Sequence, residues 1–140
     1  MDKGSSGGAL MAEPRRVGAR RLLVAWLPVI AWAALIFVLS AQPDLRFVPD
    51  AGTDFVVRKL GHMGVFGILA LSIRRAMARS TPVRRPGVAA MLLAVLYAAT
   101  DEIHQGQVVG RHAALTDVGI DATGALIALV LAGVLVSRRR

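Results

Sequence analysis

Three stretches of the chain carry acids, imidazoles and a cation at helical spacing. They hold Lys59 and His62, then the run Asp101-Glu102-Ile103-His104-Gln105, then Asp117 and Asp121. A histidine beside carboxylates can accept and release a proton near neutral pH, and a lysine can attract an anion. These residue types together indicate proton transfer or the binding of an anionic ligand.

The spacing predicts which of these side chains share a helix face, because an α-helix advances about 100° per residue. The three predicted faces are Lys59, His62, Met63 and Phe66; Tyr97, Asp101, His104 and Gln105; and Asp117, Asp121, Gly124 and Ala128. Glu102 points about a quarter-turn away from the second face. Gly61, Gly64 and Gly67 lie on another side of the first helix, where they would let a neighbouring helix approach closely.

The composition is that of a membrane protein. Hydrophobic residues make up 55% of the 140 residues, and only 19% are charged. A single aqueous core of this size could not bury so much apolar surface, which excludes a free cytosolic enzyme. There is no cysteine, so disulfides, thiolate metal sites and cysteine nucleophiles are excluded. Aromatic residues are too scarce for base stacking, and we expect no nucleic-acid partner.

Four apolar stretches predict helices that cross a membrane, for which about 20 apolar residues are needed. They are Leu22 to Leu39, Phe55 to Ile73, Gly87 to Thr100 and Val118 to Val136. They predict an all-α integral membrane bundle of four transmembrane helices over residues 22–136, between a disordered basic head (1–21) and a basic tail (137–140). A signal peptide is the rival interpretation of the first stretch, but that stretch is long for one and Leu39-Ser40-Ala41 is a poor cleavage site.

The cations predict how the bundle is oriented. Thirteen of the 17 lysines and arginines lie in residues 1–21, 74–87 and 138–140, and four lie in the other two connections. Positive residues beside membrane spans favour the cytoplasm, so both termini are expected inside. The polar ends of the second, third and fourth helices would then meet at the extracytoplasmic side. We expect them to form a cleft there.

The polar residues, taken in order, resemble a known family. The pattern is Lys59-x-x-His62-x-x-x-Phe66, Tyr97-x-x-x-Asp101-Glu102-Ile103-His104-Gln105, Gly110-Arg111 and Asp117-x-x-x-Asp121-x-x-Gly124. It is similar to the VanZ-like family over roughly residues 22–136. The resemblance implies a small bacterial protein of the plasma membrane, and the namesake is linked to low-level teicoplanin resistance. This chain departs from the family pattern at Arg58, where an acid is frequent, and at Asp121, where asparagine is frequent.

These residues suggest a hypothesis about the cleft. Arg111 and Lys59 would receive an anion, His62 and His104 would move protons, and nearby carboxylates would orient those bases. The catalytic candidates are Glu102, His104, Asp101 and His62. The ligand-binding candidates are Lys59, Arg111, Gln105, Asp117 and Asp121. We expect no cofactor and no metal. Two histidines and several carboxylates leave a metal site open as a minority alternative, but Glu102 and His104 at i, i+2 do not face one ion from a helix.

Several functions stay open at this point. The expected ligand is an anionic amphiphile of the envelope, a lipid or a lipoglycopeptide such as teicoplanin, either bound or changed by a hydrolase or group transferase. Proton-coupled transport is the alternative from another class, and a structural subunit of a membrane complex is a third. Lys59 and His62 could also simply anchor a helix end, and Asp117 could simply complement a helix dipole. The sequence does not determine the oligomeric state.

Overall fold

The fold of the chain is given by a computed structural model that describes residues 18–43, 48–80, 82–111 and 113–139. Its elements are the helices α1 (Ala19–Ser40), α2 (Ala51–Ser80), α3 (Pro86–Gln105) and α4 (Leu115–Ser137). All four are long and apolar enough to cross a membrane, which confirms the predicted all-α fold with four candidate spans. The predicted head (1–21) lies almost entirely outside the described residues.

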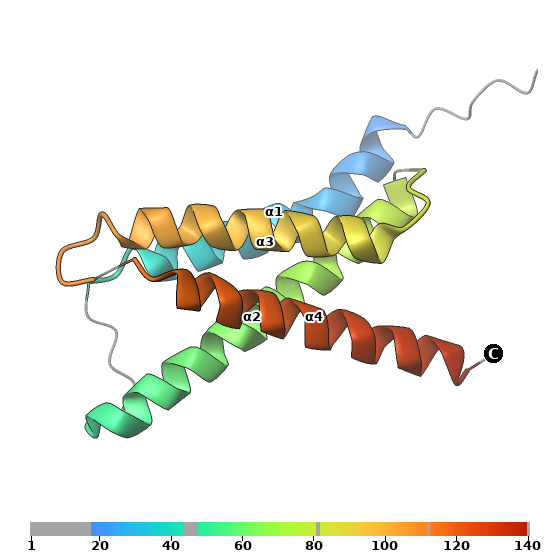
Figure 1. Ribbon diagram of the computed structural model, residues 1–140. Coiled ribbons are helices and arrows are strands. Elements are labelled where there is room, and N and C mark those ends of the chain that lie inside the picture. Colours follow the sequence, from blue (N-terminus) through green and yellow to red (C-terminus); the bar gives the residue numbers. More distant parts are fainter. Residues whose placement is uncertain (1–17, 44–47, 81, 112, 140) are drawn as a thin grey trace, which may run out of the picture.

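The helices alternate in direction, so each end of the bundle collects the same kind of segment. In Figure 1 the end of α1, the start of α2 and the α3–α4 connection lie toward one side of the bundle, and the start of α1, the α2–α3 connection and the end of α4 lie toward the opposite side. The predicted polar faces of α2, α3 and α4 therefore begin at one end.

Helix α2 is longer than the apolar stretch that predicts it. Its 30 residues would extend about 45 Å, against about 30 Å of bilayer hydrocarbon. Residues 74–80, expected in a connection, form its last two turns, where Arg79 complements the negative end of the helix dipole. A helix this long crosses its neighbours obliquely, as α2 crosses α4 in Figure 1.

Small residues allow that crossing. A side chain at Gly124 of α4 would overlap the Met63 backbone of α2, and one at Gly67 would come within 3.2 Å of the Ala128 Cβ. Of the three glycines predicted to admit a neighbouring helix, Gly67 does so, whereas Gly61 and Gly64 face open space. The crossing brings the polar starts of α2 and α4 together.

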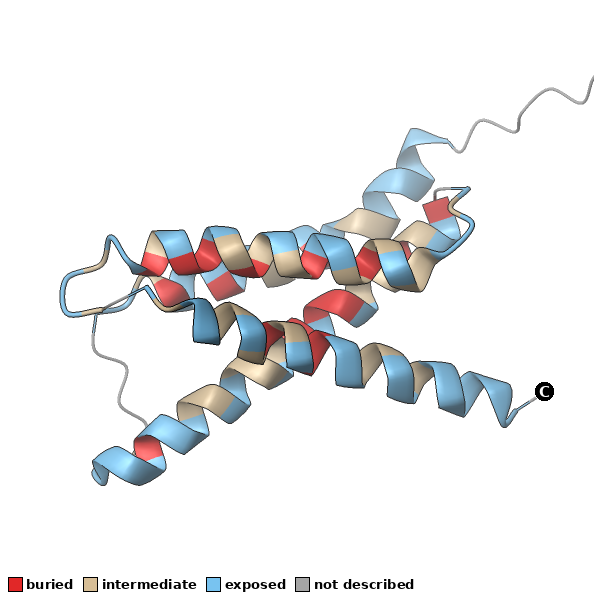
Figure 2. Ribbon diagram, in the orientation of Figure 1, coloured by how far each residue is buried: buried red, intermediate tan, exposed pale blue. Residues whose placement is uncertain are grey.

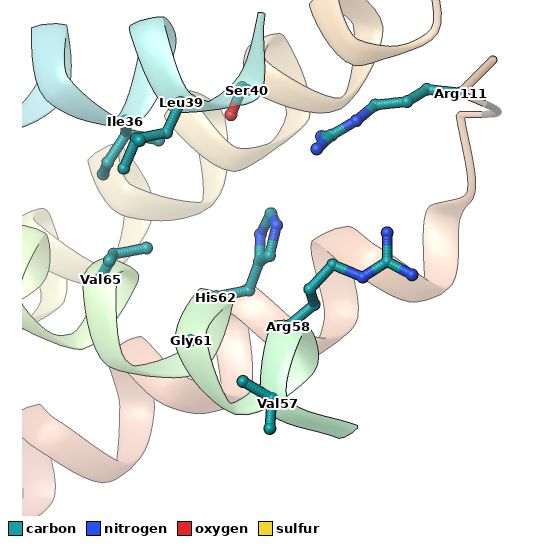
Figure 3. A pocket seen from close by; sticks show the side chains of 9 residues that line it. All are labelled: Ile36, Leu39, Ser40, Val57, Arg58, Gly61, His62, Val65 and Arg111. Atoms are coloured by element: carbon teal, nitrogen blue, oxygen red, sulfur yellow. The ribbon is translucent and has the colours of Figure 1, made fainter. Parts of the chain in front are cut away.

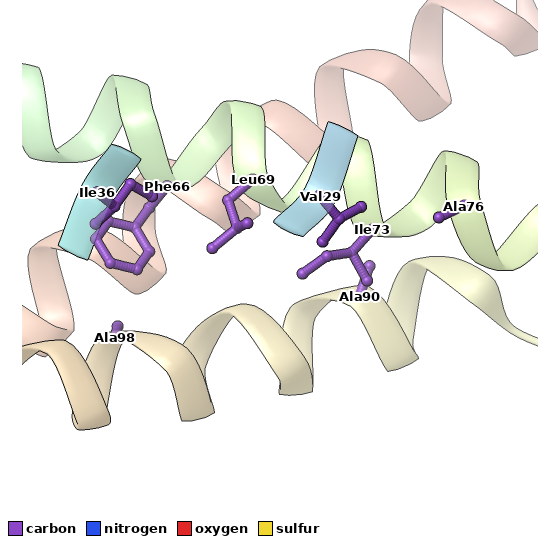
Figure 4. Packing of buried hydrophobic residues seen from close by; sticks show 8 residues of the cluster. All are labelled: Val29, Ile36, Phe66, Leu69, Ile73, Ala76, Ala90 and Ala98. Atoms are coloured by element: carbon purple, nitrogen blue, oxygen red, sulfur yellow. The ribbon is translucent and has the colours of Figure 1, made fainter. Parts of the chain in front are cut away.

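The apolar interior lies around α2, which contacts each of the other helices. Phe66, Leu69 and Ile73 of α2 pack with Val29 and Ile36 of α1 and with alanines of α3 (Figure 4). Large aliphatic side chains cover the exterior of the bundle, and the later turns of α4 are exposed almost all round (Figure 2). An apolar exterior over an apolar core is the pattern expected of helices in lipid.

Candidate functional site

A buried hydrogen-bonded network joins α1 to the end of α3. The Asp101 Oδ2 atom accepts hydrogen bonds from Ser40 Oγ and Gln105 Nε2, each at 2.8 Å. The Gln105 side chain in turn accepts from Arg111 Nη1 at 2.9 Å. Asp101, Gln105 and Ser40 are each 6% exposed or less, so the network lies in the interior at the polar end of the bundle.

The turn in the α3–α4 connection explains why a glycine precedes Arg111. Gly110 has φ 82°, in the left-handed region that side chains other than glycine rarely adopt. The turn it makes, with the Arg111 N–H donating to the Val108 carbonyl, sends the chain back toward α3. Arg111 thereby reaches Gln105, and its guanidinium lies over the space between α1 and α2 (Figure 3).

Two contacts tie the polar face of α2 to that of α4. Lys59 Nζ donates to Asp117 Oδ1 at 2.5 Å, and both side chains are about a quarter exposed. One turn deeper, His62 Nδ1 lies 3.3 Å from Asp121 Oδ1, close enough for an ion pair when the imidazole is protonated, but not aligned as a hydrogen bond. The side chains predicted to converge from α2 and α4 therefore do meet.

Glu102 and His104 lie to the sides of this cluster. The Glu102 carboxylate accepts the Ala114 N–H, just before the first turn of α4, so it holds the α3–α4 connection against the positive end of that helix. The His104 ring stacks on Phe37 of α1, with centroids 4.2 Å apart. Its Nε2 atom has no hydrogen-bond partner in the described part of the chain. Both positions are structural contacts between helices.

The start of α2 is stabilised by its own acids. Asp50 Oδ2 accepts the Thr53 N–H at 2.7 Å, and this backbone hydrogen bond lowers the pKa of the fully exposed carboxyl below its usual range. Buried Asp54 accepts from Arg58 Nε at 3.0 Å, one turn along the helix. Arg58 therefore does not compete with Lys59 for a partner, because each cation contacts its own carboxylate.

A pocket of about 230 Å³ opens between α1 and α2, under Arg111 (Figure 3). Ile36, Leu39, Val57 and Val65 form its apolar walls. Arg58, His62 and Arg111 supply its charged or titratable groups, and Ser40 and Gly61 complete the lining. The expected cleft between the second, third and fourth helices is thus not where this pocket lies, because Lys59–Asp117 and the glycine crossing close α2 onto α4.

The predicted residues divide into two groups around this pocket. His62 and Arg111 line it, and Gln105, Asp101 and Asp121 contact one of those two or the adjacent Ser40. Lys59, Glu102, His104 and Asp117 are engaged in contacts between helices instead. These placements leave the catalytic and binding roles of the nine residues as predictions.

Sequence reasoning missed Ser40 and Arg58. Ser40 ends the most apolar stretch, where a lone serine gives little signal, and its role appears only because α1 comes next to α3. Arg58 could have been found from its acid, since Asp54 and Arg58 have the i, i+4 spacing of a helical ion pair. In the described residues, no three histidine or acidic side chains gather closely enough to hold a metal ion.

The fold and site define a class: a helical protein with four candidate membrane spans and, at one end, an apolar pocket lined by two arginines and a histidine. The family model described as VanZ/LLP1 matches residues 23–136. The chain therefore belongs to the VanZ/LLP1 family, as the ordered polar motifs indicate. No curated protein and no solved structure matches it.

Proposed function

We propose that the pocket between α1 and α2 binds an anionic amphiphile of the bacterial cell envelope, on the extracytoplasmic side of the plasma membrane. The observation that carries the proposal is the combination of apolar walls with two arginines and a histidine at one opening. An acyl or prenyl chain would lie against Ile36, Leu39 and Val65. The anionic head would lie between Arg111 and Arg58, because guanidinium groups bind phosphate and carboxylate in bidentate geometry.

The charge balance supports an anion at this place. Arg111 donates to the neutral amide of Gln105, and no carboxylate in the described residues pairs with it. Arg58 shares its charge with Asp54 but is 39% exposed, so part of its guanidinium is free for a second contact. A guanidinium without a counter-ion beside a low-dielectric wall attracts anions more strongly than one in open water.

A phosphorylated envelope lipid is the ligand that fits this geometry. The narrow volume suits one head group better than a whole lipoglycopeptide, of which only the acyl chain would enter. In α1 and α2, hydrophobic residues next to those that line the pocket are exposed on the outside of the bundle. A lipid chain that begins in the pocket could therefore continue into the bilayer.

His62 could add chemistry to binding. Its ring points into the pocket in Figure 3, with Asp121 3.3 Å behind Nδ1. An imidazole can take a proton from a water or hydroxyl nucleophile, and a carboxylate 3.3 Å away can stabilise the imidazolium that forms. This arrangement supports a hydrolase or group transferase acting on the bound head group, as an extension of the binding proposal.

Two other functions have less support. A proton-coupled transporter needs polar groups that continue across the membrane, but beyond Tyr97 and Phe66 the interior of the described bundle is apolar. A purely structural subunit would pair its polar groups and leave no cavity. Here Lys59 and Asp117 do pair, but beside them is a pocket whose Arg111 has no carboxylate partner in the described residues.

Lipid analysis of the purified full-length protein tests the proposal. Mass spectrometry of the protein from a mild neutral detergent should show a phosphorylated lipid enriched over bulk lipid. The Arg111→Gln variant should retain about tenfold less, since a hydrogen bond to a charged group contributes about 1.5–3 kcal/mol. Arg138→Gln, which removes an exposed arginine at the other end, is the matched control. Equal retention by both variants, or bulk lipid alone, would overturn the proposal.

Chemistry at His62 has its own readout. If the bound lipid is a substrate, purified wild type should convert it over time, and His62→Asn should retain the lipid without converting it. Unchanged lipid with both proteins would restrict the function to binding. Loss of lipid from His62→Asn would assign the histidine to the binding contact.

A further inference from the structure

The opposite end of the bundle has a second hollow, lined by arginines. Arg20 and Arg21 from the first turn of α1 and Arg79 from the last turn of α2 surround a cavity of about 470 Å³. Val24 and Ala25, one turn further into α1, form its apolar floor. Three cations from two helices therefore converge on one space.

These arginines lack acidic partners in the part of the chain that the structure describes. No ion pair involves any of them in the described residues, whose six acids all lie at the polar end or in the connection that leads to it. Arg20 and Arg21 also stand at a helix start, where a cation is unfavourable beside the positive end of the dipole. An anion in the hollow would relieve both the mutual repulsion and the dipole term.

The contacts around the hollow fix its shape and its depth. Trp26 Nε1 donates to Ser80 Oγ at 3.0 Å, which holds the first turns of α1 against the last turn of α2. Tryptophan is enriched at the level of lipid head groups, where its ring is in the acyl region and its N–H meets polar atoms. Trp26 therefore supports a position of the hollow near head-group depth, with Val24 and Ala25 toward the hydrocarbon.

We infer that this arginine-lined hollow is a binding site for the head group of an anionic phospholipid. The phosphodiester would contact the guanidinium groups, and the glycerol and first acyl carbons would lie on Val24 and Ala25. Basic pockets between membrane helices on the cytoplasmic side bind anionic head groups by this chemistry. The site is at the end that the cation distribution predicts to be cytoplasmic, and it is independent of the pocket under Arg111.

Native mass spectrometry of the full chain in a neutral detergent tests this site, with phosphatidylglycerol and phosphatidylcholine as probes. The experiment uses the Arg111→Gln background, so that the α1–α2 pocket contributes little. The parent should retain phosphatidylglycerol more than tenfold over phosphatidylcholine. The triple variant R20Q/R21Q/R79Q should lose that preference, because each juxtamembrane cation contributes about fivefold to the binding of anionic lipid.

The matched control removes the same charge at the same end. Variant R84Q/R138Q/R139Q changes three exposed arginines outside the hollow and should keep the preference. Equal losses in the two triple variants would assign the attraction to general surface charge and overturn the site. Full displacement of the lipid by inorganic phosphate would show a free-phosphate site instead. Thermal unfolding of each variant checks that it is folded. If the triple variant is not folded, Arg79→Gln alone replaces it, with an expected loss of about fivefold in phosphatidylglycerol binding.

Discussion

The two ends of the bundle differ in whether acidic side chains of the described residues neutralise their cations. At the polar end Lys59 has Asp117, Arg58 has Asp54, and His62 lies beside Asp121. At the other end Arg20, Arg21 and Arg79 face a hollow without an acid among the described residues. At the polar end the cations are neutralised by contacts within the protein. At the other end their neutralisation depends on groups that surround the described residues.

This difference shows which charges serve the fold and which are available to a ligand. A buried or half-buried ion pair that loses one partner leaves the other uncompensated, so the paired residues at the polar end resist substitution. Exposed arginines at the basic end contribute little to folding by themselves. Arg111 is the exception at the polar end, because it is bonded to an amide rather than to a carboxylate.

The largest expected effect comes from separating α2 and α4. Gly124→Leu would place a side chain into the Met63 backbone, force the helices apart and break Lys59–Asp117 at the polar end. We expect a loss of about 3 kcal/mol in the free energy of unfolding, at the upper end of the cost of overpacking. Unfolding by denaturing detergent in mixed micelles measures it.

The matched control is Gly133→Leu, in the same helix but facing open space. It should leave stability nearly unchanged. If both variants unfold at the same point as wild type, the close crossing is not what holds the polar starts of α2 and α4 together.

A smaller loss is expected from Asp101→Ala. This change leaves the buried Ser40 hydroxyl and the Gln105 amide without their shared acceptor, which costs about 2 kcal/mol. Asp101→Asn is the control, because its carbonyl oxygen can still accept one of the two hydrogen bonds. The same unfolding assay ranks wild type first, Asp101→Asn second and Asp101→Ala last. Equal stabilities would show that the network does not join α1 to α3.

The sequence predicted four helices and the end at which the polar residues meet, because long apolar stretches and i, i+4 spacing report on local structure. It also predicted Gly124 on the same face as Asp117 and Asp121. That face does lie against α2, since a built side chain at Gly124 meets Met63. Both results rest on periodicity, which is a property of a single helix.

The location of the pocket could not be read from periodicity. It depends on which helix lies beside α2, and the apolar stretch of α1 carries almost no polar residue to indicate a contact. Ser40 becomes part of the site only through its distance to Asp101, 61 positions away. Which apolar helices pack together in a membrane depends on side-chain packing and on a few hydrogen bonds between helices. The composition of one helix does not encode these contacts.

The smallest expected effect is a pH-dependent change in stability at Asp50, just before the start of α2. Hydrogen bonding to Thr53 lowers the pKa of Asp50 in the folded protein, so its stabilising contribution is present above the pKa of an unfolded aspartate and is lost as pH falls through the folded value, below about pH 4. Asp50→Asn keeps a helix cap but cannot titrate. The stability difference between wild type and Asp50→Asn should therefore shift in favour of the variant on going from about pH 6 to about pH 3, as unfolding midpoints can measure.

Arg79→Gln, at the end without described acids, should show no such shift relative to wild type. A difference that stays constant for Asp50→Asn would mean that the charged carboxylate contributes nothing to the start of α2, and that the contrast between the two ends is confined to the buried pairs.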